Sequence, residues 1–139
     1  MDRAKQLLTP DEAAKVQWIV DDVTNPEYLT QQGSIDLWHD RTVLHFQIEE
    51  NQQKAYLETL KKVARKGGFV IIAVFSLDGA QKCSGLDVKN YDHKMIEEYL
   101  GQDFQLLNHF PYLYKMPSGD LRPYVYTLFK RTDTPKSKR

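Results

Sequence analysis

Hydrophobic and polar positions along this chain follow different periods in different segments. Over residues 49–66 apolar side chains recur every three or four positions, which predicts a helix. Its expected buried face consists of Tyr56, Leu57, Leu60, Val63 and Ala64. Arg65 and Lys66 suit the C-terminal end of a helix dipole, and Gly67 is expected to end the helix in a left-handed conformation.

The strand signals are runs of apolar or β-branched residues bounded by turn residues. Residues 69–75 are apolar throughout, which is typical of a strand covered on both faces. Four further strands are predicted at 16–20, 35–38, 104–114 and 124–129. The turn residues at 117–120 join the last two strands into a hairpin.

Two shorter helices have recognisable start signals. A first helical stretch is predicted from residue 3. A short helical turn is expected to follow it, opened by a capping box of Thr9 and Glu12 with Pro10 at the first helical position. Asp92 is the predicted N-cap of a second helix that ends at Gly101. The buried face of that helix is expected to hold Met95, Ile96, Tyr99 and Leu100.

The order of these elements predicts an α/β fold. Strands alternate with helices and are followed by an antiparallel pair, so we expect parallel strands, a C-terminal antiparallel hairpin and helices packed on the sheet. A single domain is expected over residues 1–131. Residues 132–139 are polar and basic, and we expect them to form a flexible tail.

Composition and charge narrow the possible functions. The chain has 139 residues with no net charge, so we expect no nucleic-acid partner. Cys83 is the only cysteine, which excludes an internal disulfide and favours a reducing, cytoplasmic setting. No apolar run approaches the roughly 20 residues needed to span a bilayer, and residues 1–5 lack the apolar stretch of a signal peptide, so no membrane partner is expected.

Residues 35–46 are the most informative stretch for function. They place one Trp, two His, two Asp and one Arg around an apolar strand-like run. Open α/β sheets bind their ligands at the carboxyl ends of their strands. We therefore expect a ligand site near Trp38, His39, Asp40 and Arg41.

Four segments in this order resemble the C-terminal part of the class I S-adenosylmethionine-dependent methyltransferases, from about Val16 to Arg131. The segments are 18–24, 35–41, 66–72, and 83–86 together with 91–92. The first three are similar to the third strand of the family, to its fourth strand with the following loop, and to the end of a helix with the fifth strand. The last is similar to the loop and helix before the closing hairpin.

The resemblance implies a Rossmann-like sheet that lacks its beginning. Members of the family have the strand order 3-2-1-4-5-7-6 and a Gly-rich turn after the first strand, whereas no Gly-x-Gly occurs upstream of Asp21. Such a sheet has an open edge at its fourth strand, which tends to pair with something. The third strand can pair there, two chains can complete each other, or a missing N-terminal half can be required. We expect one of the first two, and a homodimer.

The resemblance also implies an S-adenosylmethionine site. Asp21 and Asp22 end the third-strand match, where Asp22 would accept the adenine amino group and Val23 would form an apolar wall. The methionine end of the cofactor would lie beside the segment Trp38, His39, Asp40 and Arg41. His39 or Asp40 is expected to contact the substrate or to act as general base. Without the Gly-rich turn we expect weak or no cofactor binding by this chain alone.

Simpler roles remain open for several of these residues. Asp21 and Asp22 also fit a turn and cap after a strand. His39 also fits a histidine with a structural partner at a strand end, and His45 is expected to be structural. No spacing indicates a metal site. The aromatic residues of the hairpin fit cross-strand pairs, or the wall of an acceptor pocket; they are Phe110, Tyr112, Tyr114, Tyr124, Tyr126 and Phe129.

Three functions are consistent with these observations. The first is a methyltransferase domain present as its C-terminal half, with an unknown methyl acceptor that is a small molecule or a protein side chain. The second is a non-catalytic interaction or dimerisation module that derives from such an enzyme. The third is a small-molecule binder that uses the 38–41 segment.

Overall fold

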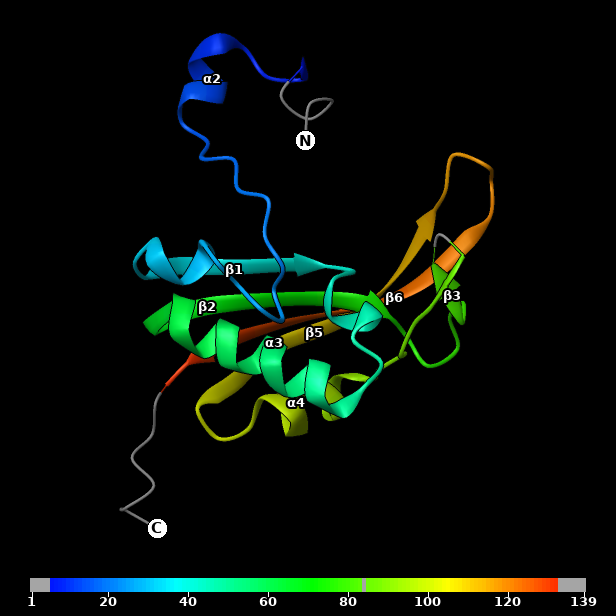
Figure 1. Ribbon diagram of the computed structural model, residues 1–139. Helices are drawn as coiled ribbons and strands as arrows, with labels where there is room; N and C mark the ends of the chain where they lie inside the picture. Colours follow the sequence, from blue (N-terminus) through cyan, green and yellow to red (C-terminus); the bar gives the residue numbers. More distant parts are fainter. Residues whose placement is uncertain (1–5, 84, 133–139) are drawn as a thin grey trace.

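A computed structural model describes residues 6–83 and 85–132 as an α/β fold (Figure 1). Its helices are α2 (Pro10–Ala14), α3 (Glu50–Val63) and α4 (His93–Leu100), with short 3-10 helices η1 (Leu29–Gln31) and η2 (Leu44–Phe46). Its strands are β1 (Ile35–Arg41), β2 (Ala64–Phe75), β3 (Lys82–Cys83), β4 (Leu86–Asp87), β5 (Phe104–Lys115) and β6 (Leu121–Arg131).

Four strands form the main sheet in the order β1-β2-β6-β5. β1 and β2 are parallel, whereas β2–β6 and β6–β5 are antiparallel. This order confirms the predicted sequence of fourth, fifth, seventh and sixth strands and the C-terminal hairpin. β1 is therefore an edge strand, and its carboxyl end lies beside that of β2, where Arg41 pairs with Ala73.

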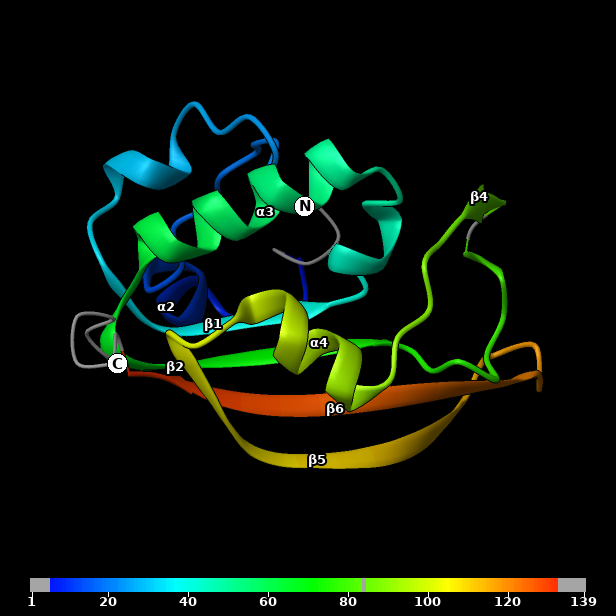
Figure 2. The same ribbon diagram turned by 90° about the horizontal axis from the view of Figure 1, so that it is seen from below.

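α3 and α4 cover the same face of the sheet (Figure 2). Tyr56 and Leu60 of α3 and Ile96 of α4 are fully buried there, against Val70 and Ile72 of β2. This burial confirms the helical faces predicted from the periodicity. Of the described residues, no helix covers the opposite face of the sheet, so apolar side chains remain exposed on it.

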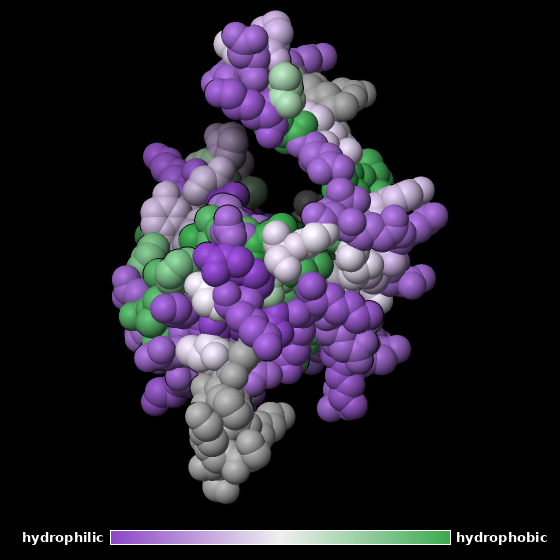
Figure 3. Space-filling model, turned by 90° about the vertical axis from the view of Figure 1, so that its left-hand side faces the viewer, coloured by the Kyte–Doolittle hydropathy of each residue, from purple (hydrophilic) through white to green (hydrophobic). Residues whose placement is uncertain are grey.

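The strand predicted at 16–20 is wrong for this structure. Residues 16–22 have no strand pairing and do not lie in the ladder beside β1. A strand needs a hydrogen-bonded neighbour, and β-prone residues alone do not supply one. In Figure 3 the segment with α2 projects from the molecule, and hydrophobic surface is visible below it.

β1 also differs from the predicted buried strand. It extends to Arg41, and only Asp40 of its seven residues is buried. The reason is that β1 has a neighbour on one side only and lacks a helix on one face within the described residues.

The helix predicted to end at Gly67 ends instead at Val63, and β2 begins at Ala64. Gly67 does adopt a left-handed conformation, with φ of 79°, but inside β2. There the register between β1 and β2 shifts, and Arg65 Nε binds Asp36 Oδ1 at 2.5 Å. The glycine therefore serves a bulge of the strand and not the helix end.

Local signals at the other helix ends are confirmed. Thr9 and Glu12 form the capping box of α2, with hydrogen bonds of 2.8 and 3.1 Å. The Asp92 carboxylate accepts the amide of Met95 at 2.8 Å and caps α4. Gly101 ends this helix with a φ of 81°.

The ends of the chain are only partly described. Of the tail expected over 132–139, the structure describes Thr132, whose amide donates to the Asp103 carbonyl at 2.7 Å. Residues 133–139 and the start of the first predicted helix lie outside the described residues. Within the described parts, none of the helices has the length and apolar character needed to cross a membrane.

We expect Gly68→Ala to lower the free energy of unfolding by about 2 kcal/mol, as is typical of overpacking. The added Cβ would lie 2.9 Å from the Arg65 carbonyl oxygen and 3.0 Å from the Asp36 carbonyl oxygen, so backbone on both strands must shift. Urea unfolding measures the effect. Gly119→Ala in the hairpin turn is the control: its Cβ meets nothing within 4 Å, and only the positive φ costs about 1 kcal/mol. An unchanged Gly68→Ala midpoint would contradict the close approach.

Candidate functional site

β1 divides the predicted site residues between two faces of the sheet, because side chains alternate along a strand. Trp38 and Asp40 point to α3, where both bind the Tyr56 hydroxyl. Arg41 points to the uncovered face, where its Nε donates to the Tyr126 hydroxyl at 3.3 Å. His39 is exposed and shares the strand parity of Arg41. The structure thus does not gather the four residues into one cluster.

Asp40 is 3 % exposed and lies at the centre of a hydrogen-bond network. Its carboxylate accepts the amides of Val43 at 2.7 Å and Leu44 at 2.9 Å, as well as the Tyr56 hydroxyl. Burial raises the pKa of Asp40, and these three hydrogen bonds oppose that shift. The network fixes the turn after β1 and ties it to α3.

Tyr56 connects Asp40 to Trp38. It donates to the Asp40 carboxylate and accepts from the Trp38 indole Nε1 at 3.0 Å, and the two rings meet edge to face at 5.6 Å. Burial, together with the charge of Asp40, raises the pKa of Tyr56 well above its ordinary value. The hydroxyl therefore remains a donor at any physiological pH.

The Asp21 carboxylate holds the loop before η1. It accepts the amides of Asp22, Glu27, Tyr28 and Leu29 at 2.8 to 2.9 Å. These hydrogen bonds, led by that of Glu27, lower the pKa of Asp21 to about 2. This arrangement matches the turn-and-cap role that the sequence left open.

Asp22 and Val23 follow in the same loop. Asp22 is exposed, and its Oδ1 accepts the Thr24 hydroxyl at 2.7 Å and the Thr24 amide at 2.9 Å, which lower its pKa. The Val23 carbonyl accepts the Thr59 hydroxyl at 2.6 Å. Thr59 lies one helical turn after Tyr56, so neighbouring turns of α3 hold this loop and the end of β1.

On the uncovered face, aromatic side chains of the hairpin surround Arg41. Its guanidinium lies over the rings of Tyr114 and Tyr124, 4.8 and 4.9 Å from their centroids. A pocket of about 390 Å³ opens beside it, lined by Arg41, Phe110, Tyr112, Tyr114 and Tyr126. The hairpin aromatics do form the predicted cross-strand pairs, with Phe110 opposite Tyr126 and Tyr112 opposite Tyr124.

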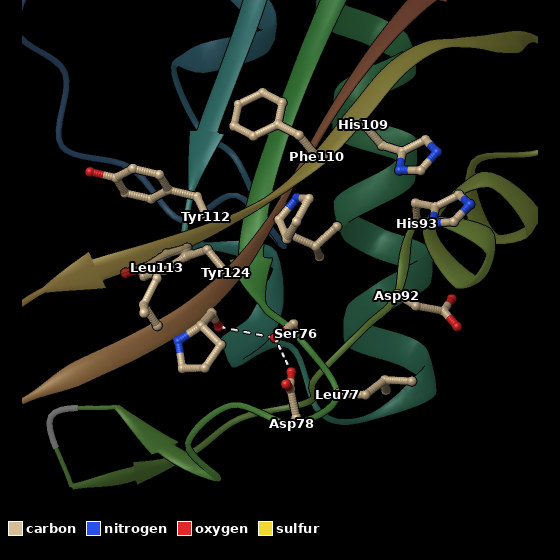
Figure 4. A pocket seen from close by; sticks show the side chains of 13 residues that line it. Ser76, Leu77, Asp78, Asp92, His93, His109, Phe110, Tyr112, Leu113 and Tyr124 are labelled. Carbon is tan, nitrogen blue, oxygen red and sulfur yellow. Dashed lines mark hydrogen bonds between the residues drawn. The ribbon is translucent and has the colours of Figure 1, made fainter.

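A larger pocket, of about 530 Å³, lies at the carboxyl end of β2 (Figure 4). The turn after β2, the start of α4 and both strands of the hairpin line it. The rings of His93 and His109 stack there at 3.6 Å, and Ser76 donates to Asp78 at 2.6 Å. No local pattern of the sequence connects these two histidines, because only tertiary packing brings α4 beside β5.

His45 is fully buried, and neither of its ring nitrogens has a hydrogen-bond partner in the described structure. Its ring lies between Phe46 and Phe75, 4.5 and 4.8 Å from their centroids. Burial lowers the pKa of His45 to about 4. The ring is therefore neutral at pH 7. Within the described residues, no three His, Cys, Asp or Glu side chains gather closely enough to hold a metal ion.

Comparison with known proteins identifies the architecture. No protein-family model matches the sequence, and no curated protein matches it. Solved structures do match: a methyltransferase from Anabaena variabilis has a TM-score of 0.63 at 18% identity, and N-methyltransferase NodS from Bradyrhizobium japonicum has 0.63 at 12%. The chain has the fold of the C-terminal part of the class I methyltransferases. The sheet order β1-β2-β6-β5 agrees with the order of fourth, fifth, seventh and sixth strands that the resemblance implied.

The match covers nearly all of this chain but only part of the similar enzymes. The match to the Anabaena variabilis enzyme covers 87% of this chain and 63% of that enzyme. The match to NodS covers 88% of this chain and 65% of NodS. A third structure is the 1,6-didemethyltoxoflavin-N1-methyltransferase of Burkholderia thailandensis, with a TM-score of 0.62 at 20% identity. That match covers 91% of this chain and 59% of the Burkholderia thailandensis enzyme. The chain therefore spans less than two thirds of these methyltransferases.

Proposed function

We propose that this chain is the C-terminal half of the catalytic domain of an S-adenosylmethionine-dependent methyltransferase. The observation that carries the proposal is the carboxyl end of β1, held beside the 21–23 loop by adjacent turns of α3 in a methyltransferase fold. A methyl transfer needs the donor and acceptor to be held in line more than it needs covalent assistance. The 21–23 loop and the end of β1, both fixed at one edge of the sheet, are suited to holding the donor and the acceptor in line.

The 21–23 loop is proposed to meet the adenine. Asp22 would accept the adenine amino group, since its side chain is exposed and both hydrogen bonds from Thr24 go to the single oxygen Oδ1. Asp21 would contribute by holding the loop in shape, and Val23 would form an apolar wall. S-adenosylhomocysteine occurs in the structures of NodS and of the Burkholderia thailandensis enzyme.

The end of β1 is proposed to border the methionine end and the methyl acceptor. Trp38 and Arg41 would line the cofactor site on opposite sides of the strand. His39 is our candidate for the general base, because it is exposed beside Arg41. Asp40 would serve the same centre as a positioning residue, since its carboxylate is buried and fully engaged.

An N-terminal half is proposed to complete the domain. β1 presents an unpaired edge, and exposed apolar residues such as Leu37 and Phe69 lie on the uncovered face. Unpaired edges and apolar patches of this kind mark interaction surfaces. A segment with the Gly-rich strand–turn–helix would supply the missing wall of the cofactor site. The single cysteine, Cys83, favours a cytoplasmic location as part of the same proposal.

The second candidate is a non-catalytic interaction or dimerisation module. It is favoured by the same unpaired β1 edge, because two copies can pair their edge strands across a twofold axis. In that case the uncovered face would bury its apolar residues against the second copy. The homodimer expected from the sequence stays a prediction.

Calorimetric titration with S-adenosylhomocysteine tests the first proposal. The chain alone is expected to show no saturable binding below about 1 mM, whereas the chain joined by the Gly-x-Gly half encoded beside it should bind at about 10 μM. In the completed domain Asp22→Asn should weaken binding about tenfold, since the uncharged amide oxygen is a weaker acceptor than the carboxylate. Asp11→Asn on α2 is the matched control.

Each other outcome contradicts a specific part of the proposal. Micromolar binding by the chain alone would overturn the incomplete site. Failure of the completed domain to bind, or absence of any neighbouring Gly-x-Gly segment in the genome, would overturn the enzymatic function. A tight dimer of the chain alone in sedimentation, together with either of the last two results, would establish the module instead.

A further inference from the structure

We propose that Arg41 and the aromatic residues around it form a subsite for a planar aromatic acid. As a statement about the methyl acceptor, this inference rests on the proposed function. The binding itself rests on the geometry of the uncovered face. The pocket concerned is the one of about 390 Å³ beside Arg41, which lies within the range of roughly 300–1,000 Å³ typical of small-molecule sites.

Arg41 is held in place while its terminal nitrogens remain available. Tyr114 and Tyr124 lie under the guanidinium, and Nε donates to the Tyr126 hydroxyl, so three residues restrict the side chain. Within the described residues the two terminal nitrogens of Arg41 have no carboxylate or other acceptor. A preorganised guanidinium without a carboxylate suits a bidentate anion.

The neighbouring wall of the pocket suits a flat ring. Phe110 stacks on Tyr126 with centroids 5.2 Å apart and planes 5° apart, and Tyr112 meets Tyr126 edge to face at 5.7 Å. Phe110 and Tyr112 are nevertheless 47% and 45% exposed. Aromatic faces that remain exposed beside a fixed cation can stack on a planar ligand whose anionic group reaches that cation.

The location links this subsite to the proposed reaction centre. Arg41 ends β1 and pairs with Ala73, so the pocket lies at the carboxyl edge of the parallel strands. His39 precedes Arg41 by two residues on the same face of β1. His39 is not among the residues that line the pocket, so a ring stacked on the hairpin would direct its anionic group, and not its far substituents, toward β1. We infer an aromatic acid as the acceptor class.

Three probes of similar size separate the two features of the subsite. 4-Hydroxybenzoate carries both ring and charge, 4-hydroxybenzamide carries the ring alone, and cyclohexanecarboxylate carries the charge alone. Amide chemical shifts of the full chain, recorded by NMR, report binding without any cofactor. We expect 4-hydroxybenzoate to bind about tenfold more tightly than either of the other probes, with shifts centred on the hairpin and the end of β1.

Two variants assign the preference to its residues. Arg41→Gln should abolish the tighter binding of 4-hydroxybenzoate relative to 4-hydroxybenzamide. Phe110→Leu should abolish the tighter binding of 4-hydroxybenzoate relative to cyclohexanecarboxylate. Arg65→Gln, at the start of β2 and outside the pocket, is the matched arginine control. Unchanged amide spectra elsewhere in the chain verify that each variant is folded.

Equal binding of the acid and the amide, or an unaltered preference in Arg41→Gln, would overturn the inference. Absence of any shift at about 10 mM probe would do so as well, since that concentration reaches millimolar affinities. None of these measurements uses S-adenosylhomocysteine. A failed cofactor titration therefore leaves the subsite intact, and a failed probe experiment leaves the cofactor proposal intact.

Discussion

Asp40→Ala is expected to lower the free energy of unfolding by about 3–5 kcal/mol, the largest effect of any single substitution considered. The alanine leaves the amides of Val43 and Leu44 and the hydroxyl of Tyr56 without their shared acceptor. All three donors lie in or beside the core, where water does not replace the carboxylate freely. The turn after β1 would lose its attachment to α3.

Urea unfolding followed by circular dichroism measures this loss. Tyr56→Phe removes one donor and keeps the ring, so it should cost only about 1–2 kcal/mol. Asp36→Ala is the matched control on the same strand, because its side chain is 82% exposed and pairs with Arg65 at the surface. That substitution should change stability by about 0.5 kcal/mol or less. A loss below 1 kcal/mol for Asp40→Ala would contradict the network.

His45 is expected to contribute a loss of about 3 kcal/mol to the free energy of unfolding when the pH is lowered from 7 to 4. The pKa of this buried ring is about 4 in the folded chain and lies near 6.5 in the unfolded one. Between these values the unfolded chain binds a proton that the folded chain does not. The contribution is therefore complete above pH 6.5 and is lost as the pH falls toward 4.

The variant His45→Phe isolates this effect, since it keeps a ring in the core and cannot be protonated. The pH slope of its unfolding free energy should flatten between pH 4.5 and 6.5, and it should be more stable than the natural chain by about 1 kcal/mol at pH 7. Asp21, with a pKa of about 2, titrates below this window. Burial raises the pKa of Asp40, which stabilises the fold toward low pH and so opposes the His45 slope.

The difference in pH slope between the natural chain and His45→Phe does not contain the Asp40 contribution, because both proteins retain that carboxylate. His39→Gln is the control at an exposed histidine and should keep the slope of the natural chain. If His45→Phe and the natural chain show the same slope from pH 4.5 to 6.5, the buried neutral ring is contradicted.

The elements that local patterns predicted correctly are those with local causes. The buried face of α3, the Asp92 cap of α4 and the hairpin around 117–120 depend on neighbours within a few residues or on a tight turn. The strand expected at 16–20 depends instead on a hydrogen-bonding partner elsewhere in the chain. β-prone residues are required for such a strand but do not provide its partner.

The sequence singles out residues 38–41 as a candidate site but does not predict how their side chains are arranged. Residues 38–41 were identified from the crowding of titratable groups after a strand. The alternation of β1 then separates Asp40, on the α3 side, from His39 and Arg41 on the uncovered side. The strand period of two makes this separation certain once the strand extends to Arg41, whereas the strand predicted from the sequence ends at Trp38.

By itself, the sequence determined the buried helix faces, the hairpin and the α/β class of fold, because periodicity, caps and turns act over short distances. The order of the strands was implied by the resemblance to the class I methyltransferases, and the candidate site at residues 38–41 stays a prediction. Only the tertiary structure decided that β1 is an open edge and that one face of the sheet lacks a cover within the described residues. It alone brought Arg41 from β1 to the tyrosines of the hairpin, more than 70 residues later. Such contacts depend on the packing of whole elements, which no local pattern records.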